Sequence, residues 1–221
     1  MKNLNYFFLC TFLCAATLSA NAHSGTSGGL TRIISDSILT IKGIGQMPHY
    51  TIDEEGNSSD APWAVFKESV TDVVISEGVT SIGRCAFYSF KNMKTVSIPS
   101  TVIVINAGSF CFCTSLESLR IPDSVRGIGN RAFSLCTSLT SITIPASVTI
   151  FEYFAFEACY SLTSITNYAI NPQKIDLTIF MNINKDNCTL FVPPHSIATY
   201  SSADEWNKFI NIKAIPDVSA D

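Results

Sequence analysis

Apolar residues recur every 23 positions through the middle of the chain. Four segments of this length align without gaps over residues 70–161. In each copy apolar and polar positions alternate, as at Val96 and Ile98, and this period of two is typical of a β-strand with one buried face. In three copies a proline follows the strand and ends it, because proline has no N–H to donate to a strand ladder. These prolines are Pro99, Pro122 and Pro145.

Each copy also has a phenylalanine at the same position. The four are Phe87, Phe110, Phe133 and Phe156. We expect the segment around each one to form a short helical turn or an irregular return to the next strand. A unit of 23 residues cannot bury its apolar side alone, but stacked copies share one continuous core. We therefore predict a short solenoid, α/β or mainly-β and of the leucine-rich-repeat type, that winds as a right-handed superhelix around a spine of stacked Phe rings.

The same pattern divides the chain into four parts. We predict a signal peptide at 1–22, an N-terminal cap at 23–69, the solenoid at 70–187 and a C-terminal cap with tail at 188–221. The solenoid holds four regular repeats and a degenerate fifth. Caps are expected because the end units of a solenoid must cover its exposed core. Within them we predict a strand at 37–41, a last strand at 187–193 and a short helix at 201–209.

The N-terminal segment has the layout of a cleavable secretory signal. Lys2 precedes an apolar run from Tyr6 to Leu18, and Ala20 and Ala22 provide small residues at the spacing of a cleavage site. The run is too short for a transmembrane span of about 20 residues. We expect export and cleavage after Ala22, the alternative being a buried N-terminal helix. No second apolar run of that length follows, so we expect no membrane insertion after cleavage.

The repeats resemble those of the BspA-type leucine-rich repeat family of secreted and surface proteins of host-associated bacteria. The motif here is IPxSVxxIxxxAFxxCxxLxxI, and the segments LTIKGIGQMPHY, APW and CTLFVPPHSIATYSSADEWNKFINI resemble cap pieces of the family. Arg32 departs from the pattern, since such pieces often have Trp there, and so does the degenerate fifth repeat. The resemblance implies extracellular or surface exposure and a protein-binding or adhesive role. It implies no catalytic site.

Composition removes several classes of function. Charged residues make up 14% of the chain, against roughly 25% in a typical domain, while 27 Ser and 20 Thr supply polarity instead. A formal net charge of −4 excludes the basic footprint of a nucleic-acid-binding protein. No metalloprotease, hydrolase-elbow or phosphate-loop motif occurs. Asp53, Glu54, Glu55 and Asp60 could hold a hard cation, but a solvated loop is the favoured interpretation. We expect no catalytic residue, metal or cofactor.

Six cysteines follow the predicted signal peptide. They are Cys85, Cys111, Cys113, Cys136, Cys159 and Cys188. Three of them share one column of the repeat, where the first copy has Phe90. A column in which Phe can replace Cys is an apolar packing column, so we favour buried thiols. A disulfide between adjacent turns remains the alternative, because neighbouring strands lie about 4.8 Å apart and bridged Cα atoms about 4.4–6.8 Å apart.

The outward positions of the repeat strands form the candidate binding surface, since solenoids bind partners on such extended surfaces. One column is Val74, Ser97, Arg120, Thr143 and Thr166, and its neighbour is Asp72, Thr95, Ser118, Ser141 and Ser164. Hydroxyl groups donate and accept hydrogen bonds, and the one Arg could pair with a carboxylate. The alternative is that Ser and Thr only favour and solubilise strands. Neither column has Tyr or Trp, which disfavours a tight interface and sugar stacking.

These observations predict a secreted or cell-surface interaction or adhesion module. We expect it to be a monomer that binds an extracellular or surface protein or glycan. One alternative is a structural scaffold of the periplasm or envelope without a host ligand. A carbohydrate-active enzyme is the third, and it would depend on a cap acid or on His49.

Overall fold

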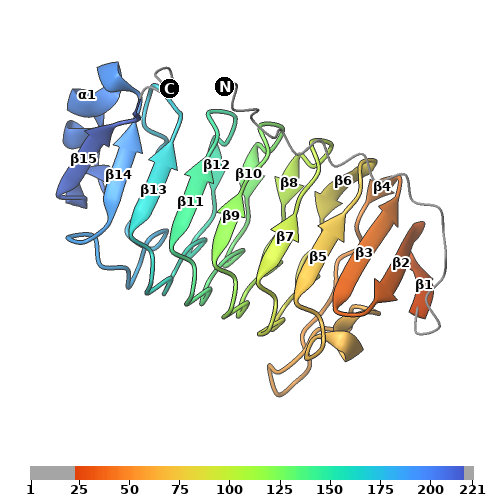
Figure 1. Cartoon of the computed structure of the whole chain (residues 1–221). Coiled ribbons are helices and arrows are strands. Elements are labelled where there is room, and N and C mark those ends of the chain that lie inside the picture. The colour runs from red at the N-terminus through yellow and green to blue at the C-terminus, as the bar shows by residue number, and fades with distance from the viewer. Residues whose placement is uncertain (1–22, 217–221) are drawn as a thin grey trace, which may run out of the picture.

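The computed structural model describes residues 23–216, so the predicted signal peptide and residues 217–221 of the predicted tail lie outside the described residues. The chain forms a solenoid whose turns each place a short strand in a front row (Figure 1). The front row is β3 (Ile38–Gly43), β5 (Asp72–Ile75), β7 (Thr95–Ser97), β9 (Ser118–Arg120), β11 (Ser141–Ile144), β13 (Ser164–Asn167), β14 (Thr189–Val192) and β15 (Asn211–Ala214). Its outward side is called the front face below.

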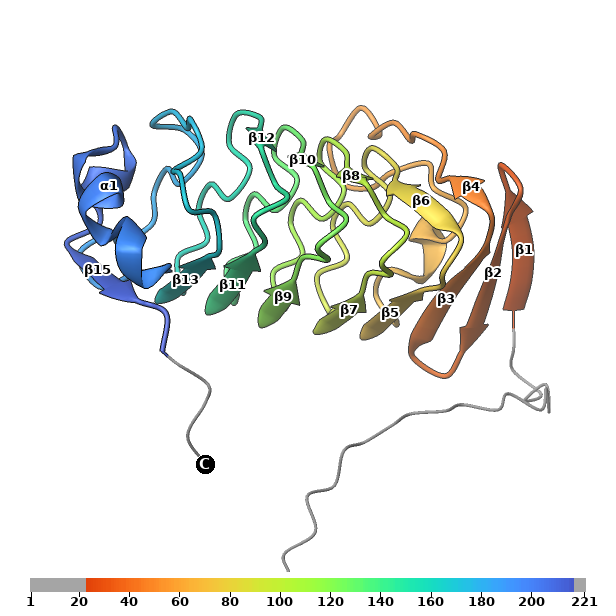
Figure 2. The ribbon, with the colours of Figure 1, turned by 90° about the horizontal axis from the view of Figure 1, so that it is seen from above.

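A second, rear row of strands runs along the other side of the core (Figure 2). It consists of β4 (Gly45–Gln46), β6 (Val79–Ile82), β8 (Val104–Ile105), β10 (Gly127–Ile128) and β12 (Ile150–Phe151). Both rows are parallel, and equivalent positions 23 residues apart pair directly, as Ile142 does with Leu119 and Ile165. The predicted solenoid with its 23-residue period is therefore confirmed.

Different elements close the two ends. At one end, β1 (His23–Ser27) and β2 (Leu30–Ser35) form a hairpin, and β2 pairs antiparallel with β3. The 3-10 turn η1 (Ala64–Phe66) follows the loop at 53–60 that contains the acidic residues. The other end carries η2 (Pro194–Ser196), α1 (Ile197–Ser202) and η3 (Trp206–Lys208). The predicted helix at 201–209 is thus displaced and broken, since α1 ends at Ser202 and Ala203 is extended. The strand predicted as the last is followed by β15, which pairs with it.

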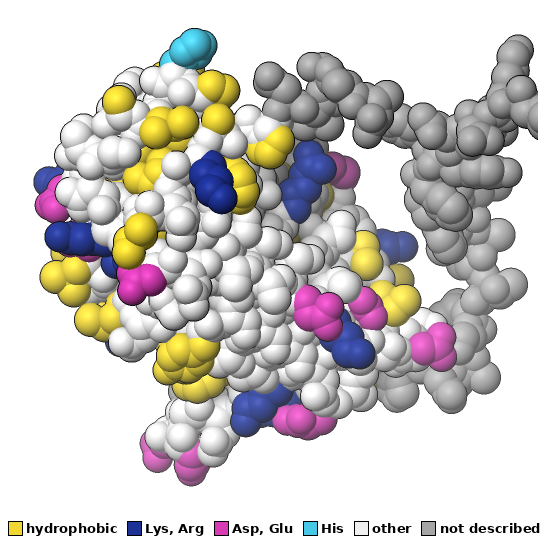
Figure 3. All heavy atoms as spheres, turned by 60° about the vertical axis from the view of Figure 1, so that its left-hand side comes forward, with side chains coloured by type: hydrophobic (Ala, Val, Ile, Leu, Met, Phe, Trp, Pro, Cys, Tyr) yellow, Lys and Arg dark blue, Asp and Glu magenta, His cyan; other side chains and the backbone are white. Residues whose placement is uncertain are grey.

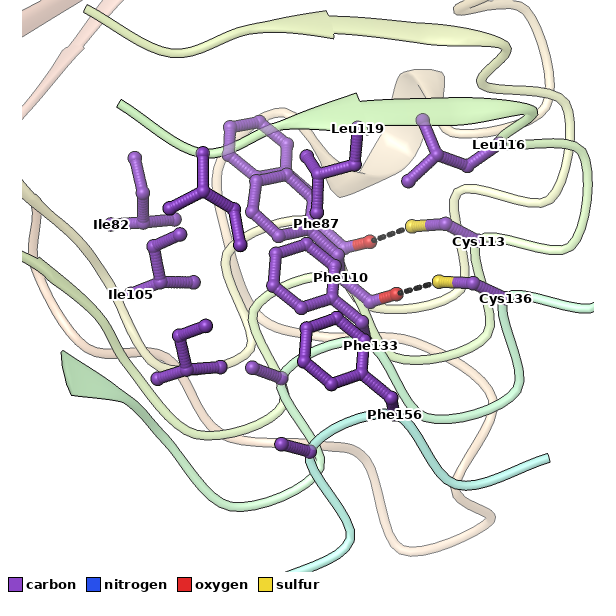
Figure 4. Close-up of a cluster of buried hydrophobic side chains, with 14 of the residues drawn as sticks. Ile82, Phe87, Ile105, Phe110, Cys113, Leu116, Leu119, Phe133, Cys136 and Phe156 are labelled. Atoms are coloured by element: carbon purple, nitrogen blue, oxygen red, sulfur yellow. Dashed lines mark hydrogen bonds between the residues drawn. The ribbon is translucent and has the colours of Figure 1, made fainter. Parts of the chain in front are cut away.

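The core is organised around a column of aromatic rings (Figure 4). Neighbouring rings of Phe87, Phe110, Phe133 and Phe156 have centroids 5.2–5.3 Å apart and lie within 10° of parallel. Trp63 extends the stack at the N-terminal side and Phe180 at the C-terminal side. Offset stacking at this distance is favourable for aromatic rings, and each ring is fully buried. The predicted Phe spine therefore exists and reaches one residue further at each end.

The returns between the rows are irregular turns. In each regular turn two backbone positions adopt a left-handed conformation, and most of them are not glycine. The cysteine column lies in these returns, where the thiols of Cys113 and Cys136 donate to the carbonyl oxygens of Phe87 and Phe110 at 3.2 and 3.3 Å (Figure 4). The returns thus connect successive turns by hydrogen bonds as well as by packing.

Candidate binding surface on the front face

The structure brings all ten predicted surface residues together on the front face. They lie at outward positions of five successive strands, and none of them is buried. The residues that alternate with them along the strands point inward. Val73 and Ile142, for example, have 1% and 2% of their surface exposed. The strands of the repeat therefore present a row of small polar side chains two columns wide.

Asp72 is held by hydroxyl groups at one end of this surface. Its carboxylate accepts hydrogen bonds from the hydroxyls of Thr95 and Thr71, the latter at 2.7 Å. These bonds, first that from Thr95, and the nearby charge of Lys94 lower the pKa of Asp72 below its usual value. Asp72 is therefore charged at neutral pH and fixed in place by its own strand neighbours.

The front row is interrupted between β7 and β9. Its strands belong to two five-stranded sheets, β1-β2-β3-β5-β7 and β9-β11-β13-β14-β15, and within residues 23–216 no ladder joins them. At this seam Val96 and Ile98 are only partly buried. The residues at the same columns of the other regular repeats, Leu119 and Ile121 among them, are at most 4% exposed. Within the regular repeats the core thus reaches the surface of the front row at this seam.

A hollow of about 440 Å³ lies over this seam. Val96, Ser97, Ile98 and Ser100 line it on one side, and Arg120, Pro122, Asp123 and Ser124 on the other. The lining combines aliphatic side chains with hydroxyls and two charges. That mixture can receive an apolar side chain while pairing polar groups around it.

A second hollow of about 580 Å³ adjoins the first and shares Arg120 and Asp123 with it. Ile121, Thr143, Ala146 and Tyr168 complete its lining. Tyr168 follows β13 and is 47% exposed, so its ring is available to a ligand. Within the part of the chain that the structure describes, the side chains of Arg120 and Asp123 have no hydrogen-bond or ion-pair partner. An unpaired guanidinium thus stands between two hollows.

Tyr168 and Asp123 were not predicted as surface residues from the sequence. Tyr168 stands one period after Pro145, at the position where three regular repeats have their strand-ending proline. That exchange of Pro for an aromatic residue is the signal that could have identified it. Sequence columns alone place no aromatic residue on the strands, and Tyr168 reaches the front face from just beyond one.

The remaining chemical candidates from the sequence are the acidic residues at 53–60 and His49. The described residues contain no group of three or more His, Cys, Asp or Glu side chains placed to hold a metal ion. Asp60 accepts hydrogen bonds from the backbone and hydroxyl of Thr51, and Asp53 from the backbone of Asn57, so both carboxylates hold their own loop together. Nδ1 of His49 accepts a hydrogen bond from the backbone N–H of Arg84 at 3.0 Å. It lines a separate hollow of about 380 Å³ on the rear row.

All six described cysteines are buried and unpaired. Burial raises the pKa of Cys111, Cys159 and Cys188 to about 12 and that of Cys113 and Cys136 well above its usual value. A thiol with so high a pKa is a poor nucleophile and metal ligand, because the thiolate is the reactive form. The packing interpretation of the cysteine column agrees with this geometry.

Charge is sparse over the surface seen in Figure 3, where basic and acidic side chains lie scattered among uncharged ones. Within the described residues no helix combines the length and the apolar character needed to cross a membrane. On the side of the molecule seen in Figure 3 the charges thus stand singly and form no large charged patch.

Comparison with known proteins gives one family and several solved structures. The family model for the BspA-type leucine-rich repeat region matches residues 64–186 with six copies. A leucine-rich repeat protein from Eubacterium ventriosum is 27% identical, with a TM-score of 0.50 over 64% of this chain and 42% of that one. The T. pallidum protein TpLRR is 21% identical (TM-score 0.47, covering 66% and 68%), and the pneumococcal vaccine antigen PcpA 18% (0.49, covering 71% and 38%). A search of curated proteins finds no match.

Proposed function

Because this chain belongs to the BspA-type leucine-rich repeat family, we propose that it is an exported, non-catalytic interaction module that binds a protein or glycan through its front face. The partner belongs to the host or to the envelope of the cell that makes it. Export rests on the signal-like segment at 1–22, and the secreted or surface location follows from it. The chain matches 42% of the length of the Eubacterium protein, so whatever the longer relative does is not assumed for this one.

The observation that carries the proposal is the unpaired Arg120 between two hollows. Arg and Tyr are the residue types that most often dominate the energy of an interface, and Tyr168 lines the same surface as Arg120. The surrounding hydroxyls can pair with backbone or sugar groups without competing charges. Because no described residue pairs with this guanidinium, its donors are available to a ligand.

The test is capture of a partner by the immobilised protein from mucosal extract and from the cell's own envelope fraction. We expect a double variant, Arg120→Ala with Thr143→Ala, to lose the captured partner. The matched control is Arg126→Ala with Thr149→Ala, which makes the same two changes in the same turns next to the rear-row strands β10 and β12. Equal loss in both double variants, or in neither, would contradict binding at the front face.

Location is tested separately by fractionation of the producing cells. The proposal expects the protein in the medium or on the outer surface, where protease added to intact cells removes it. A pool confined to the periplasm would instead support a structural envelope scaffold.

A further inference from the structure

We infer that the front face binds an extended peptide with an aliphatic side chain, a carboxylate and an aromatic side chain at alternate positions. This inference rests on the proposed function and names its ligand class. The two hollows and the unpaired Arg120 between them carry it. Each of these three features selects one part of the peptide.

The seam hollow selects the aliphatic side chain. Val96 and Ile98 line it, and their counterparts at the same columns of the other regular repeats are buried, so the inward columns of the front row leave apolar surface in water here. Covering that surface with a branched aliphatic side chain removes it from water and is favourable. Among the rim serines, Ser100 already donates from its hydroxyl to Glu77 Oε1 at 3.0 Å, whereas no described residue bonds to the hydroxyl of Ser97, which can therefore pair with a ligand backbone.

Arg120 selects the carboxylate. Its guanidinium presents paired donors that match the two oxygens of a carboxylate, and no described residue occupies them. Asp123 lies on the same rims without a partner of its own. Asp123 repels a second acidic group and can accept an N–H from the ligand backbone. The site therefore favours a peptide with one acidic side chain rather than an acidic run.

The second hollow selects the aromatic side chain. Tyr168 offers a half-exposed ring, and Thr143 and Ala146 leave room beside it. A ligand ring packed edge-to-face on Tyr168 gains more than its buried area alone provides.

Spacing sets the order of these three groups. The seam lies between β7 and β9, Arg120 is on β9, and Tyr168 follows β13, two strands further on. Neighbouring strands lie about 4.8 Å apart, so the groups span about 12 Å across the row. Side chains at alternate positions of an extended chain are about 6.8 Å apart, and three of them span about 13 Å. The two outer groups match this span, and Arg120, which stands nearer the seam than β13, must reach along the row with its long side chain to meet the middle position of the pattern aliphatic-x-acidic-x-aromatic.

A glycan fits the same surface less well. It could use Arg120 and the hydroxyls, but it would leave the aliphatic floor of the seam against polar groups. The partly exposed Val96 and Ile98 therefore favour a peptide.

The test uses the peptide acetyl-Gly-Ile-Ser-Asp-Ser-Phe-Gly-amide titrated into the purified protein by NMR. We expect shifts at Val96, Arg120 and Tyr168, and about tenfold weaker binding when Asn replaces the peptide Asp, since a charge-assisted bond is lost. Arg120→Gln should weaken the parent peptide by about the same factor and leave the Asn peptide unaffected. Asp123→Asn should bind the parent peptide equally or more tightly.

A matched pair tests the seam itself. Val96→Thr keeps the side-chain shape but places a hydroxyl on the apolar floor, and we expect it to weaken the Ile peptide by about threefold. Val104→Thr makes the same change at a partly buried valine of the rear-row strand β8, away from the hollow, and should have no effect. Both variants must keep the melting temperature of the parent protein within a few degrees. Thermal unfolding followed by far-ultraviolet circular dichroism measures this.

Three results would overturn the inference. They are peptide shifts away from the two hollows, equal affinity for the Asp and Asn peptides, and tighter binding of an oligosaccharide series than of the peptide. In each case capture of a natural partner that still depends on Arg120 and Thr143 would leave the proposed function intact. If the peptide test fails and capture of a natural partner does not depend on Arg120 and Thr143 either, the inference and the proposed function are both contradicted.

Discussion

At the scale of single residues, the returns hold ordinary side chains in a backbone conformation that favours glycine. Two columns have positive φ, one with Cys85, Gly108, Arg131 and Phe154, the other with Ser89, Phe112, Leu135 and Ala158. A left-handed conformation costs a residue with a Cβ about 1–2 kcal/mol. The packing of the returns must offset this cost in every turn.

Ala158→Gly tests that cost against a matched neighbour. Relief of the left-handed strain should offset the buried methyl group, worth about 0.8 kcal/mol, so we expect the free energy of unfolding to change by less than about 0.5 kcal/mol. Ala155→Gly removes an equally buried methyl at a position outside the left-handed region. It should destabilise by about 1.5 kcal/mol, because glycine also loses more backbone entropy on folding. Equal losses in chemical denaturation would contradict this account.

The cysteines give a second prediction at this scale. With buried thiols whose pKa values are raised, the folded protein at pH 8 should react with a thiol reagent far more slowly than the unfolded one. Unfolding without a reductant should then release all six thiols of the chain from His23 onward. Three or more thiols that appear only after reduction would show disulfides in place of buried thiols.

At the scale of elements, the distance between neighbouring turns leaves no room for a side chain at Gly129, which directly follows the rear-row strand β10. A Cβ at Gly129 would lie 2.6 Å from the backbone nitrogen of Ala107 in the preceding turn. A Cβ at Gly127 would meet only Ile150 and Val104, each at 3.8 Å, which is ordinary contact. The two glycines are two residues apart and yet face different constraints.

Alanine at these two positions should therefore have opposite outcomes. We expect Gly129→Ala to lower the free energy of unfolding by about 1–3 kcal/mol or more, since the backbone of the adjacent turn must move. Gly127→Ala should change it by less than about 0.5 kcal/mol. Thermal and denaturant unfolding of both variants measures the difference, and a Gly129→Ala protein as stable as the parent would exclude the close approach.

Elements also show how far the sequence could be used for prediction. Long-range periodicity identified the front strands and the Phe spine, because each column repeats the same inward side chain. The rear row escaped prediction because strands such as Val104–Ile105 are only two residues long and show no alternation. The seam escaped it as well, since Val96 and Ile98 fit the inward pattern and only the gap between β7 and β9 exposes them. Periodicity states which side chains face inward, whereas the separation of two turns depends on their packing.

At the scale of the whole molecule, the solenoid is a one-dimensional stack in which each turn contacts only its neighbours. Its ends are closed by two tryptophans at opposite ends of the aromatic column. Trp63 donates from Nε1 to the carbonyl of Ala86 at 2.6 Å, and Trp206 to that of Gln173 at 2.8 Å. Both indoles are fully buried. Each tryptophan is thus tied to the adjacent turn by one side-chain hydrogen bond and by a ring contact, with Phe87 for Trp63 and with Phe180 for Trp206.

This arrangement predicts that damage to a cap stays near that cap. Trp206→Ala removes a buried indole, which costs about 3–5 kcal/mol locally, so amides of β13, β14 and β15 should exchange with solvent faster while those of β5 and β7 remain protected. Trp63→Ala should produce the mirror image, with faster exchange in β3 and β5 first. Hydrogen exchange followed by mass spectrometry measures both patterns. A uniform loss of protection along the chain in either variant would show a single cooperative unit, and the front face would then depend on both caps for its shape.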